Sequence, residues 1–164
     1  MKFGAVDTSA AAGCILAHST RLNGSTFKKG RILSQEDISA LLSHGFQSVT
    51  VARLEAGDVK ENLAADRIAA AANGGGLSAD APFTGRVNLR AETSGLLVID
   101  KHAVDAMNRI DPALTIATLP AFEEVSEDRM VATAKIIPFA VAGELVSKAE
   151  QTIKNALRIA PFSA

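Results

Sequence analysis

The longest apolar run in the chain extends from Arg129 to Val141, RMVATAKIIPFAV, and its composition predicts a buried strand. The β-branched residues of this run are Val131, Thr133, Ile136 and Ile137. Such side chains suit a packed, pleated surface. Pro138 lacks an amide hydrogen, so the strand should end there. Lys135 is charged within this apolar run, so it must reach the surface, pair with a carboxylate or face an anionic ligand.

Shorter patterns in the first third of the chain predict three strands, a hairpin and a helix. The expected strands are Phe3 to Val6, Cys14 to His18 and Gln47 to Leu54, and the hairpin contains Ser25 to Lys29 between Gly24 and Gly30. The helix should begin at Ser34, because its side chain can form a capping box with Asp37. Gly45 should end this helix, because glycine readily adopts the left-handed conformation found after a helix.

A second helix and a run of three glycines suggest how the chain divides. Asp58 and Glu61 repeat the capping pattern, and apolar residues at helical spacing follow them up to the glycine run, Gly74 to Gly76. Consecutive glycines are flexible, so this run is the expected boundary between two subdomains. The predicted subdomains are 1–73, a strand-hairpin-helix-strand-helix unit, and 77–164, a strand-rich unit with a C-terminal helix.

The second half mixes strands and helices without regular alternation. The expected strands are Arg86 to Ala91, Leu96 to Ile99 and Leu114 to Leu119, and the expected helices are a short one capped by Asp100 and one from Gly143 to Ala156. This order favours the α+β class, with mixed strands and short helices in two packed subdomains, over a doubly wound sheet. The number of strands in the second half also suggests a barrel-like arrangement there.

Composition restricts the classes of partner. The apolar content of 48% can support a packed core, and 17 lysines and arginines balance 18 acids, so no net field attracts nucleic acid or an anionic membrane. The single cysteine, Cys14, excludes an internal disulfide and agrees with a cytoplasmic location. We therefore expect a soluble protein of the cytoplasm, with Cys14 in the core.

No catalytic or metal-binding pattern emerges from the residues. His18, His44 and His102 lie in three separate predicted elements, and none has the spacing of a metal site. The acids between Glu123 and Asp128 lie in a polar loop, where a carboxylate stays solvated, whereas a carboxylate that acts as a catalytic acid or base needs burial. We assign no catalytic residues and no metal ligands.

One polar set interrupts the apolar strands of the second half. Its members are Thr84, Gly85, Arg86, Asn88 and Lys135. Two cations with hydroxyl and amide donors could bind an anion or a heterocycle if the two strands are neighbours. The alternative is that Arg86 and Lys135 pair with acids such as Glu92 or Asp100, as many surface cations do.

Four stretches of the chain resemble the N-terminal region of bacterial molybdopterin-binding proteins. They are RILSQEDISALLSHGFQSVTVARLEAGDV, APFTGRVNL, SGLLVID and MVATAKIIPFAV. In that family this region precedes a domain similar to those of molybdopterin molybdotransferases, and some members also carry a domain related to molybdenum cofactor cytidylyltransferases. The motifs of those downstream domains have no counterpart in this sequence.

The resemblance implies an N-terminal domain in molybdenum cofactor biosynthesis or handling, not catalytic alone, within a parent protein that is a cofactor-biosynthesis transferase. It implies molybdopterin as the cofactor, held by the polar set that contains Arg86 and Lys135. The implied partner is a phosphorylated pterin or a downstream molybdopterin-binding domain. A structural or oligomerisation module, which pairs an exposed strand edge with another copy or docks a downstream domain, is the alternative.

Overall fold

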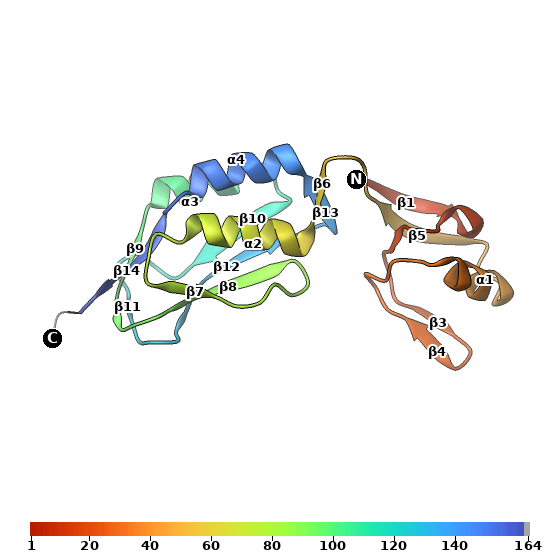
Figure 1. Cartoon of the computed structure of the whole chain (residues 1–164), viewed down its shortest axis with the longest axis horizontal. Coiled ribbons are helices and arrows are strands. Elements are labelled where there is room, and N and C mark those ends of the chain that lie inside the picture. The colour runs from red at the N-terminus through yellow and green to blue at the C-terminus, as the bar shows by residue number, and fades with distance from the viewer. Residues whose placement is uncertain (163–164) are drawn as a thin grey trace. The chain divides into compact units, whose positions relative to one another are not determined.

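The computed structural model describes residues 1–162 and shows an α+β protein that divides into two compact units, residues 1–58 and residues 59 onward (Figure 1). Each unit contains its own buried hydrophobic cluster. The boundary after Asp58 differs from the boundary expected at Gly74 to Gly76, which separated 1–73 from 77–164. The physical reason is the second helix, whose alanine-rich face packs on the sheet of the second unit.

The first unit contains a three-stranded antiparallel sheet, a hairpin and one helix. The sheet has the order β1-β5-β2, with β1 at Lys2–Asp7, β5 at Ser48–Arg53 and β2 at Ile15–Leu16. A short 3-10 turn, η1 (Thr8–Ala10), follows β1. The hairpin is formed by β3 (Thr20–Leu22) and β4 (Ser25–Phe27), and the helix α1 spans Gln35–Ser43. Cys14 is buried in this core, as expected.

Ser34 caps α1 as the sequence predicts. Its hydroxyl accepts a hydrogen bond from the amide of Asp37 at 3.2 Å, and the carboxylate of Asp37 accepts one from the amide of Ser34 at 3.1 Å. Gly45 has a φ of +85° just after the helix, which confirms the predicted stop. Sequence alone therefore located both ends of α1.

The second unit is built on a four-stranded antiparallel sheet with the order β10-β12-β8-β7. These strands are β7 (Leu77–Ala79), β8 (Arg86–Ala91), β10 (Leu114–Thr118) and β12 (Met130–Ile136). A second sheet has the order β11-β9-β14, from β9 (Gly95–Ile99), β11 (Glu124–Val125) and β14 (Leu157–Pro161), and β6 (Asp58–Lys60) pairs with β13 (Ala140–Ala142). None of these sheets closes on itself within residues 1–162, so the strands do not form the barrel-like arrangement that was expected.

Three helices complete the second unit. They are α2 (Glu61–Ala72), α3 (Lys101–Asn108) and α4 (Gly143–Ile153). Helix α2 lies over β8 and β12, and α4 packs against α2 and α3, so the helices gather on one side of the four-stranded sheet (Figure 1). Asp100 caps α3 by accepting a hydrogen bond from the amide of Ala103, as predicted. Asp58 does not cap α2, because it belongs to β6 and accepts a hydrogen bond from the amide of Glu55.

The apolar run from Arg129 to Val141 contains two strands rather than one. Strand β12 ends before Pro138, as the missing amide hydrogen predicts, and the chain resumes as β13 beside β6. Ile136 is fully buried, whereas Ile137 is 60% exposed. Adjacent residues of an extended chain point to opposite faces, so only Ile136 contributes to the core.

The glycine run is held in place rather than flexible. The amide of Gly74 donates to the carbonyl of Leu157 at 2.7 Å, and the side chain of Asn73 donates to the carbonyl of Leu77 at 2.6 Å. A Cβ added to Gly74 would lie 2.8 Å from the carbonyl oxygen of Asn155. These glycines therefore allow a close approach between backbone segments within the second unit. In residues 1–162, no helix has the length and apolar composition that crossing a membrane requires.

Candidate functional site

The structure brings the two strands of the predicted polar site together. Strands β8 and β12 are antiparallel neighbours, and Arg86 lies directly opposite Lys135. Directly opposed residues project to the same face of a sheet. This is the face of the β10-β12-β8-β7 sheet opposite α2, and it carries Arg86, Asn88, Arg90, Thr133 and Lys135; we call it the open face.

A tight turn shapes one end of the open face. The amide and carbonyl groups of Phe83 and Arg86 bond to each other in both directions at 3.0 Å, and Thr84 and Gly85 at the turn both have positive φ. Two positive φ values are characteristic of type I′ hairpin turns. Glycine accepts this conformation at little cost, but a β-branched threonine there is strained. Thr84 is exposed, and Gly85 is buried.

Hydrogen bonds anchor this strained turn to the rest of the second unit. The amide of Gly85 donates to Oδ1 of Asn62 at 2.7 Å, and the carbonyl of Gly85 accepts from the amide of Ile136 at 2.8 Å. Lys135 Nζ donates to the carbonyl of Thr84. Strain of this kind persists only where surrounding contacts enforce it, and these contacts connect the turn to α2 and β12.

Arg86 and Lys135 do not form the ion pairs considered as the alternative. Lys135 is half-buried and donates to a carbonyl instead of to Glu92 or Asp100. Arg86 is exposed, and no acidic side chain among residues 1–162 forms a salt bridge with it. Its guanidinium is therefore available to an anion from solution.

Asn88 belongs to a hydrogen-bonded network across the open face. Its Nδ2 donates to Oδ2 of Asp80 at 3.1 Å, and its Oδ1 accepts from the hydroxyl of Thr133 at 2.8 Å. Arg90 Nε donates to Oδ1 of Asp80 at 3.0 Å. The hydrogen bond from Arg90, and then the one from Asn88, lowers the pKa of Asp80, so this carboxylate stays charged. Asn88 thus has a structural role within the sheet, because both ends of its amide already have partners.

Sequence reasoning missed Arg90 and Asp80. Arg90 stands two positions after Asn88 in a strand, and the two-residue period of side chains places both on one face. That spacing was the available signal for Arg90. Asp80 carried no such signal. It lies eight residues before Asn88 in the chain, and only the turn at Thr84 and Gly85 brings the two side chains together.

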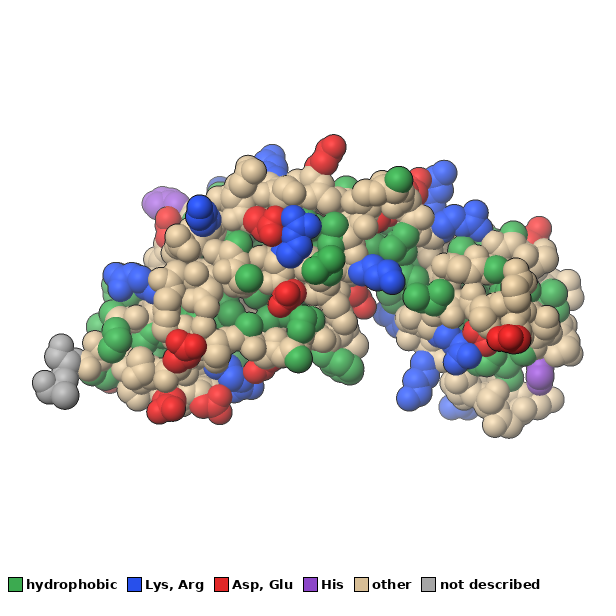
Figure 2. Space-filling view, viewed as in Figure 1, with side chains coloured by type: hydrophobic (Ala, Val, Ile, Leu, Met, Phe, Trp, Pro, Cys, Tyr) green, Lys and Arg blue, Asp and Glu red, His purple; other side chains and the backbone are tan. Residues whose placement is uncertain are grey.

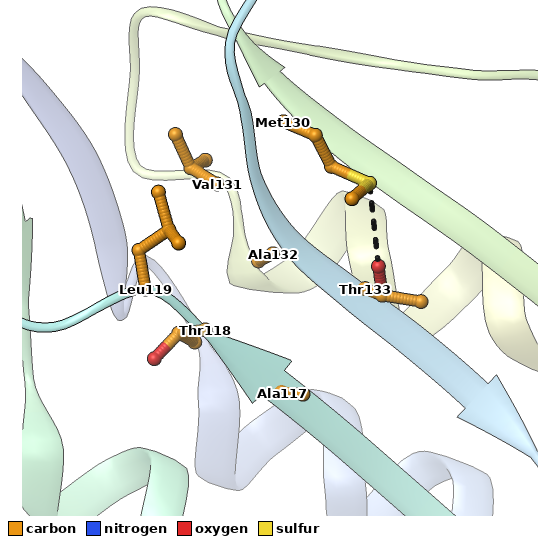
Figure 3. Close-up of a pocket in the computed structure, with 7 residues that line it drawn as sticks. All are labelled: Ala117, Thr118, Leu119, Met130, Val131, Ala132 and Thr133. Carbon is orange, nitrogen blue, oxygen red and sulfur yellow. Dashed lines mark hydrogen bonds between the residues drawn. The ribbon is translucent and has the colours of Figure 1, made fainter.

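A small hollow lies between β10 and β12, beside Met130 (Figure 3). Its volume is about 150 Å³, and its lining comes from Ala117, Thr118 and Leu119 at the end of β10 and from Met130 to Thr133 on β12. The hydroxyl of Thr133 lies 3.8 Å from the sulfur of Met130. Ligand pockets usually measure about 300 to 1,000 Å³, so this hollow is too small for a cofactor.

Charges of both signs are interspersed on the surface visible in Figure 2, without a broad region of one sign. Each cation therefore has to be judged by its own neighbours. By that criterion the open face offers one free guanidinium at Arg86, the ammonium of Lys135, which has further protons to donate, and the hydroxyl of Thr84. The arrangement can bind an anionic group, but it contains no nucleophile paired with a base.

Comparison with known proteins gives one partial match. A family model described as a domain of unknown function (DUF8806) matches residues 5–53, which span β1 to β5 of the first unit. No curated protein and no solved structure matches the chain. The second unit, which contains the open face, lies outside the matched region.

Proposed function

We propose that the chain is the N-terminal module of a bacterial molybdopterin-binding protein, acting in molybdenum cofactor biosynthesis or handling in the cytoplasm and not catalytic alone. The support is the resemblance of its four sequence stretches, two of which, APFTGRVNL and MVATAKIIPFAV, contain the neighbouring residues of the open face. The parent protein is then a cofactor-biosynthesis transferase. The partner is a phosphorylated pterin or a downstream molybdopterin-binding domain.

The single observation that carries this proposal is the exposed guanidinium of Arg86 opposite Lys135. A guanidinium can bind two phosphate oxygens with parallel hydrogen bonds, and an ammonium adds a point charge. Molybdopterin carries a phosphate, and Thr84 adds a hydroxyl at the same turn. Asn88 contributes by holding the strands in register rather than by offering a free amide.

Titration calorimetry with molybdopterin, or with a stable phosphorylated pterin, tests this function. The parent protein should bind, and Arg86→Ala should weaken binding by about 1.5 to 3 kcal/mol, the usual contribution of a hydrogen bond to a charged group. Binding should also weaken as salt is raised. The matched control is Arg158→Ala, which removes another exposed arginine of the second unit from β14. Absence of binding by the parent, or equal losses in the two variants, would refute the proposal.

The edge of β1 supports a second candidate, a structural or oligomerisation module. Strand β1 has six residues, pairs with β5 on one side only, and exposes 59% of Phe3. The amide of Thr8 donates to the carbonyl of Gln47, so Thr8 and Gln47 form a hydrogen-bonded pair at the end of this strand pairing. Hydrogen-bonded pairs recur at every second residue of an antiparallel ladder, so the even-numbered residues of β1 bond to β5. Phe3, Ala5 and Asp7 therefore direct their amides outward. Such an edge can pair with a strand of another copy or of a downstream domain.

Proline substitution separates edge pairing from folding. Ala5→Pro removes an amide that points away from β5, so the first unit should stay folded while any dimer dissociates. Gly4→Pro removes an amide that bonds to β5 and should unfold the unit. Light scattering after gel filtration measures the oligomer, and circular dichroism checks the fold. A parent that is monomeric at all concentrations would contradict self-association.

A further inference from the structure

A larger pocket lies in the second unit between the start of α3 and the end of β10. Its volume is about 470 Å³, which is in the range of small-molecule sites. Its apolar lining consists of Ile99, Val104, Leu119, Pro120 and Ala121, and its polar lining consists of Lys101, Asp105 and Thr118. None of these residues belongs to the polar site predicted from the sequence.

An internal contact next to this pocket shows what the edge of β10 can bind. The side-chain amide of Asn108, at the end of α3, forms two hydrogen bonds with Ile116. Its Nδ2 donates to the carbonyl at 2.9 Å, and its Oδ1 accepts from the amide at 2.8 Å. A carboxamide can do this because its N–H and C=O lie side by side on one edge of a planar group.

The next residue along this edge, Thr118, offers the same pair of groups to the pocket. Along a strand, the main-chain amide and carbonyl of successive residues point alternately toward and away from the neighbouring strand. The amide of Leu119 points toward β12, because it donates to the carbonyl of Val131. The amide and carbonyl of Thr118 therefore point away from β12, as those of Ile116 do. In the part of the chain that the structure describes, neither group has a hydrogen-bond partner.

The occupant of this edge should be a small molecule rather than an added strand. A pairing strand needs successive outward-facing residues, but Ile116 is occupied by Asn108, and the amide of Leu114 donates to the carbonyl of Asp111 at 3.1 Å. An ordinary trans peptide bond also directs its N–H and C=O to opposite sides. A carboxamide or a cyclic amide presents both groups on one edge of a single amide, whereas a peptide can match them only through the N–H and C=O of one extended residue, which belong to two different peptide groups.

The two charged residues of the lining add specificity. Lys101 and Asp105 are four residues apart on α3, so they lie on the same face of the helix. They form no salt bridge with each other or with any other residue in 1–162. Asp105 can accept a hydrogen bond from a further N–H of a ligand, and Lys101 can donate to a further acceptor.

We infer that this pocket binds a small molecule with a cis amide edge, a primary carboxamide or a lactam ring, that pairs with the main chain of Thr118. The ring or apolar body of the ligand lies against Val104, Leu119 and Pro120. This inference is independent of the proposed phosphate contact at Arg86, because the two sites share no residue.

Nuclear magnetic resonance titration with two simple probes tests the inference. Benzamide and 2-pyridone have the cis amide edge, and N,N-dimethylbenzamide and N-methyl-2-pyridone lack its donor but keep the ring. The first pair should shift the Thr118 amide signal saturably, and the methylated pair should bind at least tenfold more weakly. No saturable shift with either probe, or equal binding by the methylated pair, would overturn the inference. A short peptide that binds as well as the probes would also overturn it.

Two alanine substitutions, one within β10 and one just after it, provide the matched variants. Ala121 is exposed and lines the pocket, so Ala121→Tyr should fill it and weaken probe binding at least tenfold. Ala117 is also exposed but lines only the smaller hollow beside Met130, so Ala117→Tyr should bind like the parent. If both variants bound the probes equally well, the probes would bind outside this pocket and the inference would be wrong. The methylated probes keep the test decisive if either variant fails to fold.

Discussion

The guanidinium of Arg31 forms two hydrogen bonds with the carboxylate of Asp37, from Nε at 2.8 Å and from Nη2 at 2.9 Å. The same carboxylate closes the capping box of α1 with Ser34. Asp37 is buried, and its ion pair joins the segment before the helix to the first helical turn. One side chain thus serves both the local helix start and the packing of the first unit.

Asp37→Asn should destabilise the first unit by about 1 to 2 kcal/mol, the upper part of the range for losing a helix cap. The neighbouring exposed acid gives the control, and Glu36→Gln should have little effect. Denaturant unfolding followed through amide signals of β5 measures the difference. Equal stability of the two variants would show that the ion pair contributes nothing.

The same contact predicts how the stability of the first unit depends on pH. The hydrogen bond from Arg31 lowers the pKa of Asp37, despite the opposing effect of burial. A carboxyl group whose pKa is lower in the folded state stabilises that state fully above its unfolded pKa, about 3.9. This contribution is lost as the pH falls below that value and through the folded pKa. In Asp37→Asn the pH dependence should be weaker in that range.

Ile136→Asp should unfold the second unit, because it places an unpaired carboxylate in the core. That burial costs several kcal/mol against a total stability of about 5 to 15 kcal/mol. Ile137→Asp is the matched control, because this neighbouring side chain is exposed, and it should melt like the parent. Thermal melts of the two variants that coincide would contradict the assignment of β12.

Gly85→Ala should destabilise the hairpin turn for two reasons. Its φ is +69°, which costs an L side chain about 1 to 2 kcal/mol, and a new Cβ would lie 2.7 Å from the Glu61 carboxylate and 2.9 Å from the carbonyl of Ile136. Gly45→Ala in the first unit is the control, because its φ of +85° is similar and its Cβ would meet nothing within 4 Å. Denaturant unfolding should show the larger loss for Gly85→Ala. A similar loss of stability in both variants would show that crowding of the new Cβ does not contribute.

The glycine run 74–76 should resist limited proteolysis. Cleavage requires the backbone to detach, and here the hydrogen bond from Gly74 to Leu157 holds it. Gly74→Ala should expose the run, because the new Cβ would displace the carbonyl of Asn155. Mass spectrometry of early proteinase K fragments should find cuts near residue 75 in the variant only. Early cuts there in the parent would restore the idea of a flexible boundary.

The sequence determined the elements whose signals are local. The capping box of Ser34 and Asp37, the stop at Gly45 and the cap at Asp100 each require contacts within a few residues. The strand 86–91 was predicted with its observed bounds, because its apolar residues alternate with polar ones. Such patterns are readable without knowledge of distant partners.

The tertiary structure decided what depends on distant segments. Helix α2 belongs to the second unit because of its packing there. The glycine run is held by a hydrogen bond from Gly74 to Leu157, and Ile136 rather than Ile137 is buried in the core. The tertiary structure also joined β8 to β12, which placed Arg86 opposite Lys135 while committing Asn88 to Asp80. The pairing of strands far apart in sequence sets each of these outcomes, because partner and register determine which groups meet, and no local pattern specifies them.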